Sequence, residues 1–132
     1  KRVNKELATL GVDVSKFGRF RVYDFFGIKR PKKFSYDKQY NTCFVVFGPV
    51  YHKIPAHKLV VGFAQPWIAY PYNDAYPLLS FKERLKNKVK FAFQSFLFKR
   101  YDELVVEHQH VKDALLENRY TNSIHVVSNT IN

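Results

Sequence analysis

Two short apolar runs, each followed by a turn with proline, constrain the fold of this 132-residue chain most strongly. The runs are Cys43–Phe47 and Leu59–Phe63; Gly48 and Pro49 end the first, and Pro66 closely follows the second. Runs of about four to eight residues rich in Val and Phe, without polar alternation, are typical of strands that are covered on both faces. They therefore predict the central strands of a parallel sheet.

Segments with helical spacing alternate with further apolar runs after the second of these strands. Ser80 and Glu83 form a capping-box pattern at the start of a long helical segment. Alternation of strands and helices is typical of crossover connections between parallel neighbours. We therefore predict an α/β domain with a Rossmann-like parallel sheet and flanking helices. The expected strands are Cys43–Phe47, Leu59–Phe63, Glu103–Val106 and Ile124–Val127, and the expected helices lie near residues 81–100 and 109–118.

The long helix near residues 81–100 has an apolar stripe that we expect to face the core. Phe91 and Phe98 lie off that stripe, so they either pack against a neighbouring segment or meet a membrane surface. The basic residues of the helix are candidates for contact with a membrane or another anion. The predicted core stripe is Phe81, Leu85, Val89, Ala92 and Phe96, and the basic set is Lys82, Arg84, Lys86, Lys88 and Lys90.

The first third of the chain has weaker patterns. Val3–Leu10 predicts the end of a helix, and Gly11 is its expected stop. Arg19–Phe26 largely alternates charged with apolar residues, which is typical of a half-exposed strand. Phe34–Tyr40 is the site of a short expected helix before the first core strand.

The composition narrows the class of protein. The net charge of +11, from 22 basic and 11 acidic residues, favours anionic partners: nucleic acid, lipid headgroups or phosphorylated substrates. No apolar segment approaches the roughly 18 residues that span a bilayer, and the charged amino terminus lacks the apolar core of an export signal, so we expect a cytoplasmic protein. The chain has no methionine, and we expect it to be a piece of a longer protein.

The turns after the predicted strands are the first place to look for a functional site. In open α/β sheets the ligand crevice lies beyond the carboxyl ends of the strands. Gly48 and Gln65 lie in two such turns; Trp67 beside them is either a platform for a ligand ring or a core anchor. Glu107 and His108 end the third strand and open a helix whose free N–H groups suit an anion. The alternative is that Glu107 caps the helix and His108 is a surface residue.

Other chemistry is not indicated by the sequence. The chain lacks both common glycine-rich phosphate loops, so we expect no bound cofactor. Five histidines are present, but none has a spacing typical of a zinc site, so no metal is expected. The single cysteine, Cys43, cannot form an internal disulfide and is expected to be a small core residue.

Four stretches in residues 40–132 together resemble a known family. They are FVVFGPVY, KLVVGFAQPWIAYP, YDELVVEHQHVKDALLENRY and IHVVSNTIN. In order and spacing this set resembles the amino-terminal half of GT-B glycosyltransferases. The nearest group is the retaining, family 4-like enzymes with a "glycosyltransferase group 1" carboxyl half, which are common in bacterial polysaccharide and lipopolysaccharide biosynthesis.

The resemblance implies that residues 1–132 form the incomplete, acceptor-side domain of such an enzyme, without its donor-binding domain. The whole enzyme would transfer a sugar from a nucleotide-sugar to a lipid-linked or polysaccharide acceptor, and this piece alone would be inactive. The loop with Gln65 and Trp67 would face the acceptor; Glu107 stands where the family usually has glutamine. Expected partners are the missing domain, the acceptor, a further copy of the chain, and an anionic membrane at the inner face of the cytoplasmic membrane.

A basic nucleic-acid-binding module is the alternative from a different functional class. The charge and the abundant aromatic residues favour it. Against it, the basic residues are spread over a loop and one helix, and no RNA- or DNA-binding signature is present. We therefore do not expect nucleic acid among the partners.

Overall fold

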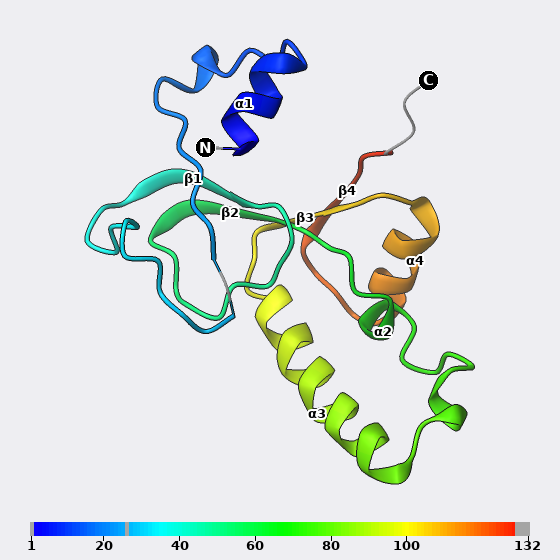
Figure 1. The fold of residues 1–132 in the computed structure, drawn as a ribbon. Helices are drawn as coiled ribbons and strands as arrows, with labels where there is room; N and C mark the ends of the chain where they lie inside the picture. Colours follow the sequence, from blue (N-terminus) through cyan, green and yellow to red (C-terminus); the bar gives the residue numbers. More distant parts are fainter. Residues whose placement is uncertain (1, 26, 129–132) are drawn as a thin grey trace. The chain divides into compact units, whose positions relative to one another are not determined.

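The computed structural model describes residues 2–25 and 27–128 (Figure 1). The chain divides into two compact units, one up to Ser35 and one from Tyr36. The first unit holds helix α1 (Arg2–Thr9) and the 3-10 helix η1 (Ser15–Phe17). The second unit holds the sheet and all remaining helices.

Helix α1 ends as its sequence predicts. Gly11 has a φ of 67°, in the left-handed region that glycine adopts at little cost. This conformation lets the N–H of Val12 reach back to the carbonyl of Leu7 at 2.9 Å, which satisfies a carbonyl at the end of the helix. The predicted stop at Gly11 is confirmed.

Two predictions for the first third are wrong within the described residues. Residues 19–25 do not form a strand, and Phe26 lies outside the described residues. Their apolar side chains serve an aromatic cluster instead: the rings of Tyr23 and Phe25 pack edge-on against Phe34, at 5.1 and 5.3 Å between centroids. Residues 34–39 likewise form no helix, and Tyr40 already belongs to the first strand.

The second unit contains the predicted parallel sheet. Its strands are β1 (Tyr40–Val45), β2 (Ala56–Gly62), β3 (Glu103–Val106) and β4 (Ser123–Val126). All neighbours are parallel, in the order β1-β2-β3-β4. The Rossmann-like α/β fold is therefore confirmed. Strands β1 and β2 each begin three residues earlier than predicted. The added residues of the two strands pair with each other, and because β1 is an edge strand, polar residues can remain exposed there.

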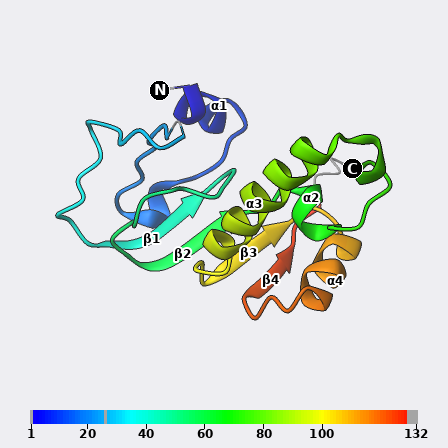
Figure 2. The same cartoon turned by 90° about the horizontal axis from the view of Figure 1, so that it is seen from below.

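The helices of this unit are α2 (Pro66–Ala69), the 3-10 helix η2 (Tyr76–Leu78), α3 (Phe81–Phe98) and α4 (Gln109–Glu117). The predicted capping box of α3 is present: Glu83 Oε2 accepts from the N–H of Ser80 at 3.0 Å, and Ser80 Oγ accepts from the N–H of Glu83 at 3.4 Å. Both views place α2, α3 and α4 on one face of the sheet (Figures 1 and 2). This follows from sheet order, because right-handed crossovers that all step in one direction leave their helices on one side.

The core lies between this face and the helices. Val61, Leu104 and Ile124 are buried on the sheet side, opposite Phe98 and Leu115. The prediction that β1 and β2 are covered on both faces is wrong for the described residues, because Thr42 and Phe44 of β1 are exposed and Val60 of β2 is only half-buried on the side away from the core. The sheet's other face, called the second face below, carries exposed or half-exposed side chains.

Three strands are linked by an ion pair and a histidine contact on the second face. Lys58 Nζ lies 2.6 Å from Glu103 Oε1, and His125 Nε2 lies 3.4 Å from Glu103 Oε2. The hydrogen bond from Lys58 lowers the pKa of the Glu103 carboxyl below its ordinary value. The Lys58 and His125 side chains are about half exposed, so this part of the second face is in contact with water.

Helix α3 packs on the face opposite to the predicted one. Its buried residues are Phe91, Gln94, Leu97 and Phe98. The stripe predicted to face the core points outward; Phe81 is 79% exposed and Phe96 is 60% exposed. Both faces of α3 carry apolar residues, so spacing alone could not identify the inner one. Tertiary partners decide it: Phe98 meets Phe63 edge-on at 4.8 Å between ring centroids.

Two phenylalanines of α3 allow a direct test of this orientation. Replacing fully buried Phe98 by alanine should lower the free energy of unfolding by about 3–5 kcal/mol, because it leaves a cavity in the core. The matched change Phe96→Ala, on the outward face, should cost less than about 1 kcal/mol. Urea unfolding followed by circular dichroism measures both. Equal losses would show that α3 is turned differently.

Candidate functional site

The carboxyl ends of the four strands meet at one edge of the sheet. Backbone hydrogen bonds continue past the strand ends: Gly48 donates to Gly62 at 3.4 Å, Phe63 to Val105 at 2.8 Å, and Val127 to Val106 at 2.8 Å. Ligands of open parallel sheets bind beyond this edge. The loops that leave it form the candidate site.

Two glycines let β1 and β2 leave the sheet in close contact. A Cβ atom on Gly48 would overlap the side chain of Val61, and one on Gly62 would overlap the carbonyl oxygen of Val46. Gly48 was predicted as a site residue; the structure places it at this edge, where its lack of a side chain is a packing requirement. Any role in ligand binding would therefore be through its backbone.

The edge also carries a stack of three aromatic rings. His108 and His110 are nearly parallel, with 5.2 Å between ring centroids, and His110 is stacked with Tyr70 at 6.3 Å. Tyr70 follows α2 and the two histidines open α4, so the stack joins the exits of β2 and β3. Its imidazole nitrogens and phenol are hydrogen-bonding groups of the kind that bind sugar hydroxyls or phosphate.

Helix α4 begins at this stack, because two of the three rings belong to its N-cap residue and its second residue. His108 is the N-cap residue and makes no side-chain capping bond, while its carbonyl accepts from Val111 at 3.2 Å and Lys112 at 3.3 Å. Glu107, which was considered as the cap, precedes the N-cap position and is exposed. The free N–H groups of a helix start favour an anion.

Trp67 and Gln65 occupy different positions from the stack. The ring of Trp67 lies parallel to Phe91 of α3 at 5.9 Å between centroids, and edge-on to Tyr76 at 5.1 Å. Trp67 is half-buried and packs on the core, which favours the anchor interpretation over a free platform for a ligand. Gln65 is the half-buried N-cap of α2, and its carbonyl accepts from Ile68 and Ala69.

The aromatic loop between α2 and α3 borders two hollows of about 490 and 480 Å³. The larger one lies between this loop and the start of α3, and the smaller one between the loop and α4. Arg84 holds the loop in place, since its side chain donates to the carbonyls of Leu79 at 2.8 Å and Pro77 at 2.6 Å. Of the predicted basic set, Arg84 is thus already engaged within the chain.

The lysines of that set all lie at the surface. Lys82, Lys86 and Lys88 are exposed, and Lys90 is exposed with its Nζ 5.1 Å from the ring centre of Phe91. In the described part of the chain no helix combines the length and the apolarity needed to cross a bilayer. Phe91 and Phe98, considered for membrane contact, are buried.

Cys43 and the metal-binding residue types add no chemistry to the edge. Burial raises the pKa of the Cys43 thiol, so the thiol is protonated near neutral pH and is a poor nucleophile. Over residues 2–25 and 27–128 there is no cluster of three or more His, Cys, Asp or Glu side chains that could hold a metal ion.

Sequence reasoning found His108 but missed its two ring partners, Tyr70 and His110. A usable signal was present, because two histidines two residues apart span a strand-to-helix junction. Tyr70 carried no comparable signal, since its place in the stack depends on the path of the loop after α2.

Comparisons with family models, with curated proteins and with solved structures give no match for this chain. The chemistry of the edge must therefore be inferred from its geometry and from the resemblance of its motifs.

The role of Trp67 can be tested by stability. Trp67→Ala should lower the free energy of unfolding by at least about 2 kcal/mol, because its ring packs between Phe91 and Tyr76. Tyr72→Ala removes a ring that is 95% exposed and should change stability by less than about 0.5 kcal/mol. Urea unfolding monitored by circular dichroism compares them. If Trp67→Ala leaves the free energy of unfolding unchanged, Trp67 would instead be interpreted as a platform for a ligand.

Proposed function

We propose that this chain is the acceptor-side domain of a retaining GT-B glycosyltransferase. The observation that carries the proposal is the shared position of the four resembling stretches. The first stretch begins at Phe44, near the end of β1, and the other three contain most or all of β2, β3 and β4. The residues that follow these strands gather at the carboxyl edge of one parallel sheet. A family resemblance whose motifs converge on one edge is better supported than one whose motifs are scattered.

The strand order supports the same proposal. A doubly wound sheet has two halves that extend in opposite directions from a central switch point, where ligands bind. The order β1-β2-β3-β4 matches one such half. The switch point would then lie beside β1, whose Phe44 is 54% exposed and which is followed by Phe47 at 76%. Further strands pairing with β1 would cover this apolar surface.

The proposed division of labour follows from the groups at the edge. Tyr70, His108 and His110 would hold an acceptor sugar by hydrogen bonds and ring contact, and the start of α4 would hold a phosphate of a lipid-linked acceptor. The nucleotide-sugar would be bound by a second, donor-binding domain. The chain alone would then be inactive, and the complete enzyme would act at the inner face of the cytoplasmic membrane.

Transfer assays on the protein that carries both domains test the role of the stack. With a radiolabelled nucleotide-sugar and a lipid extract as acceptor, His108→Ala and His110→Ala should each lower kcat/KM at least about tenfold, because each removes a contact to the acceptor. His57→Ala is the matched control: His57 is also exposed, but lies near the amino-terminal end of β2. Unchanged transfer in both stack variants would exclude the proposed acceptor site.

Calorimetry on the chain itself tests the division of labour. Titration with UDP-glucose or GDP-mannose should give no heat beyond dilution, since the donor-binding groups are proposed to lie in the other domain. Micromolar affinity for either compound would contradict the proposal. Tight binding of single-stranded RNA or DNA would favour the nucleic-acid-binding alternative.

A further inference from the structure

The outward face of α3 is an apolar surface that the fold leaves uncovered within the described residues. We call this face the α3 stripe; it consists of Phe81, Leu85, Val89, Ala92 and Phe96. Phe81, Leu85 and Val89 are 79%, 56% and 65% exposed. The stripe recurs at helical spacing over the length of α3, directly opposite the buried face. A contiguous exposed apolar surface of this kind marks a site of contact with another phase or molecule.

Positive charges border the α3 stripe. Lys82, Lys86 and Lys90 follow each other at four-residue spacing along one side, and Lys88 lies on the other side. The acidic residues of α3 are limited to Glu83, whose carboxylate is engaged with Ser80 in the capping box. The stripe is therefore a row of apolar side chains between cations.

The loop before α3 extends this surface at the amino-terminal end of the helix. Leu78 is 87% exposed and Tyr72 is 95% exposed, and both lie in the segment that Arg84 fastens to the helix. In Figure 1 this loop and the start of α3 project away from the sheet. Tyr72 and Phe81 line the same hollow as Lys88, and Leu78 lies three residues before Phe81. We call these three exposed residues the tip.

We propose that the α3 stripe binds the surface of a bilayer that contains anionic lipid. Helix α3 would lie in the plane of the membrane, with the stripe and tip at the boundary between headgroups and acyl chains and the lysines at the lipid phosphates. The charges favour this occupant over a second copy of the chain, because pairing two stripes would place lysine rows against each other. The proposal is independent of the glycosyltransferase assignment, since it concerns α3 and not the carboxyl edge.

Cosedimentation with vesicles tests the proposal on the chain as it is. Vesicles of phosphatidylcholine with phosphatidylglycerol should bind the protein at low salt, and vesicles of phosphatidylcholine alone should not. Each lysine near an anionic surface strengthens binding about fivefold, so Lys82→Glu/Lys86→Glu/Lys90→Glu should weaken binding by at least about 100-fold. High salt should release the protein.

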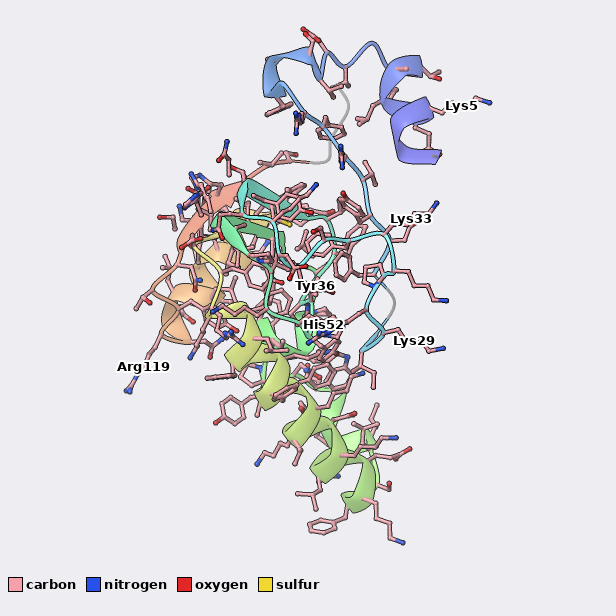
Figure 3. All side chains as sticks on the ribbon, turned by 90° about the vertical axis from the view of Figure 1, so that its left-hand side faces the viewer. Lys5, Lys29, Lys33, Tyr36, His52 and Arg119 are labelled. Atoms are coloured by element: carbon pink, nitrogen blue, oxygen red, sulfur yellow. The ribbon has the colours of Figure 1, made fainter. Side chains whose placement is uncertain are left out.

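A matched charge control separates the stripe from the net charge of the whole chain. Lys29→Glu/Lys32→Glu/Lys33→Glu makes the same change in net charge at exposed positions of the first unit. Lys29 and Lys33 extend into solvent in Figure 3. This variant should keep most of its binding. An equal loss in both triple variants would show that only net charge matters and would overturn the proposal.

The apolar part of the stripe is tested by Leu85→Ser/Val89→Ser. These exposed positions should tolerate serine without loss of fold, which circular dichroism verifies, while binding to anionic vesicles should fall at least about tenfold. Unchanged binding, or equal binding of the native chain to neutral vesicles, would refute the proposal. Failure of the native chain to bind anionic vesicles would also refute the proposal. So would a native chain that dimerises in solution and loses that dimer on these two substitutions, because the stripe would then bind a second copy.

Discussion

The sequential parallel pairing of four strands determines most of what this chain presents to its surroundings. Because every connection steps to the next strand in the same direction, α2, α3 and α4 all lie on one face of the sheet. That single constraint buries Val61 and Leu104 and leaves the second face to solvent. It also brings all four carboxyl ends to one edge, where the stack of Tyr70, His108 and His110 is built.

The elements that could be predicted from sequence are those with strong local signals. Ser80 and Glu83 locate the start of α3 by capping chemistry, and Gly11 ends α1 through a backbone conformation that other residues adopt at a cost. The apolar runs located β3 and the apolar part of β2, because central strands must be apolar. The starts of β1 and β2 were both displaced by three residues, since the two strands first pair with each other along polar positions such as Asn41 and Lys58.

The errors share a physical cause, which is that burial depends on partners distant in the sequence. The α3 stripe and the buried face of α3 are both apolar, and the choice between them rests on Phe63 and Trp67, which lie on other elements. The alternation in residues 19–25 was read as a strand, yet it supplies rings to Phe34. In the candidate site, His108 was found by its place after a strand, whereas Tyr70 depends on the path of a loop.

The contact among Lys58, Glu103 and His125 divides the second face of the sheet into two regions. It spans β2, β3 and β4, whereas the equivalent position on β1 is the exposed ring of Phe44, paired in register with Val60. The face is thus ionic on one side and apolar on the other. A layer that covered the whole face would strip water from the charged pair of Lys58 and Glu103 and from the polar ring of His125, at a cost that ion pairing often fails to offset. A layer over β1 alone would bury Phe44 and leave those charges hydrated.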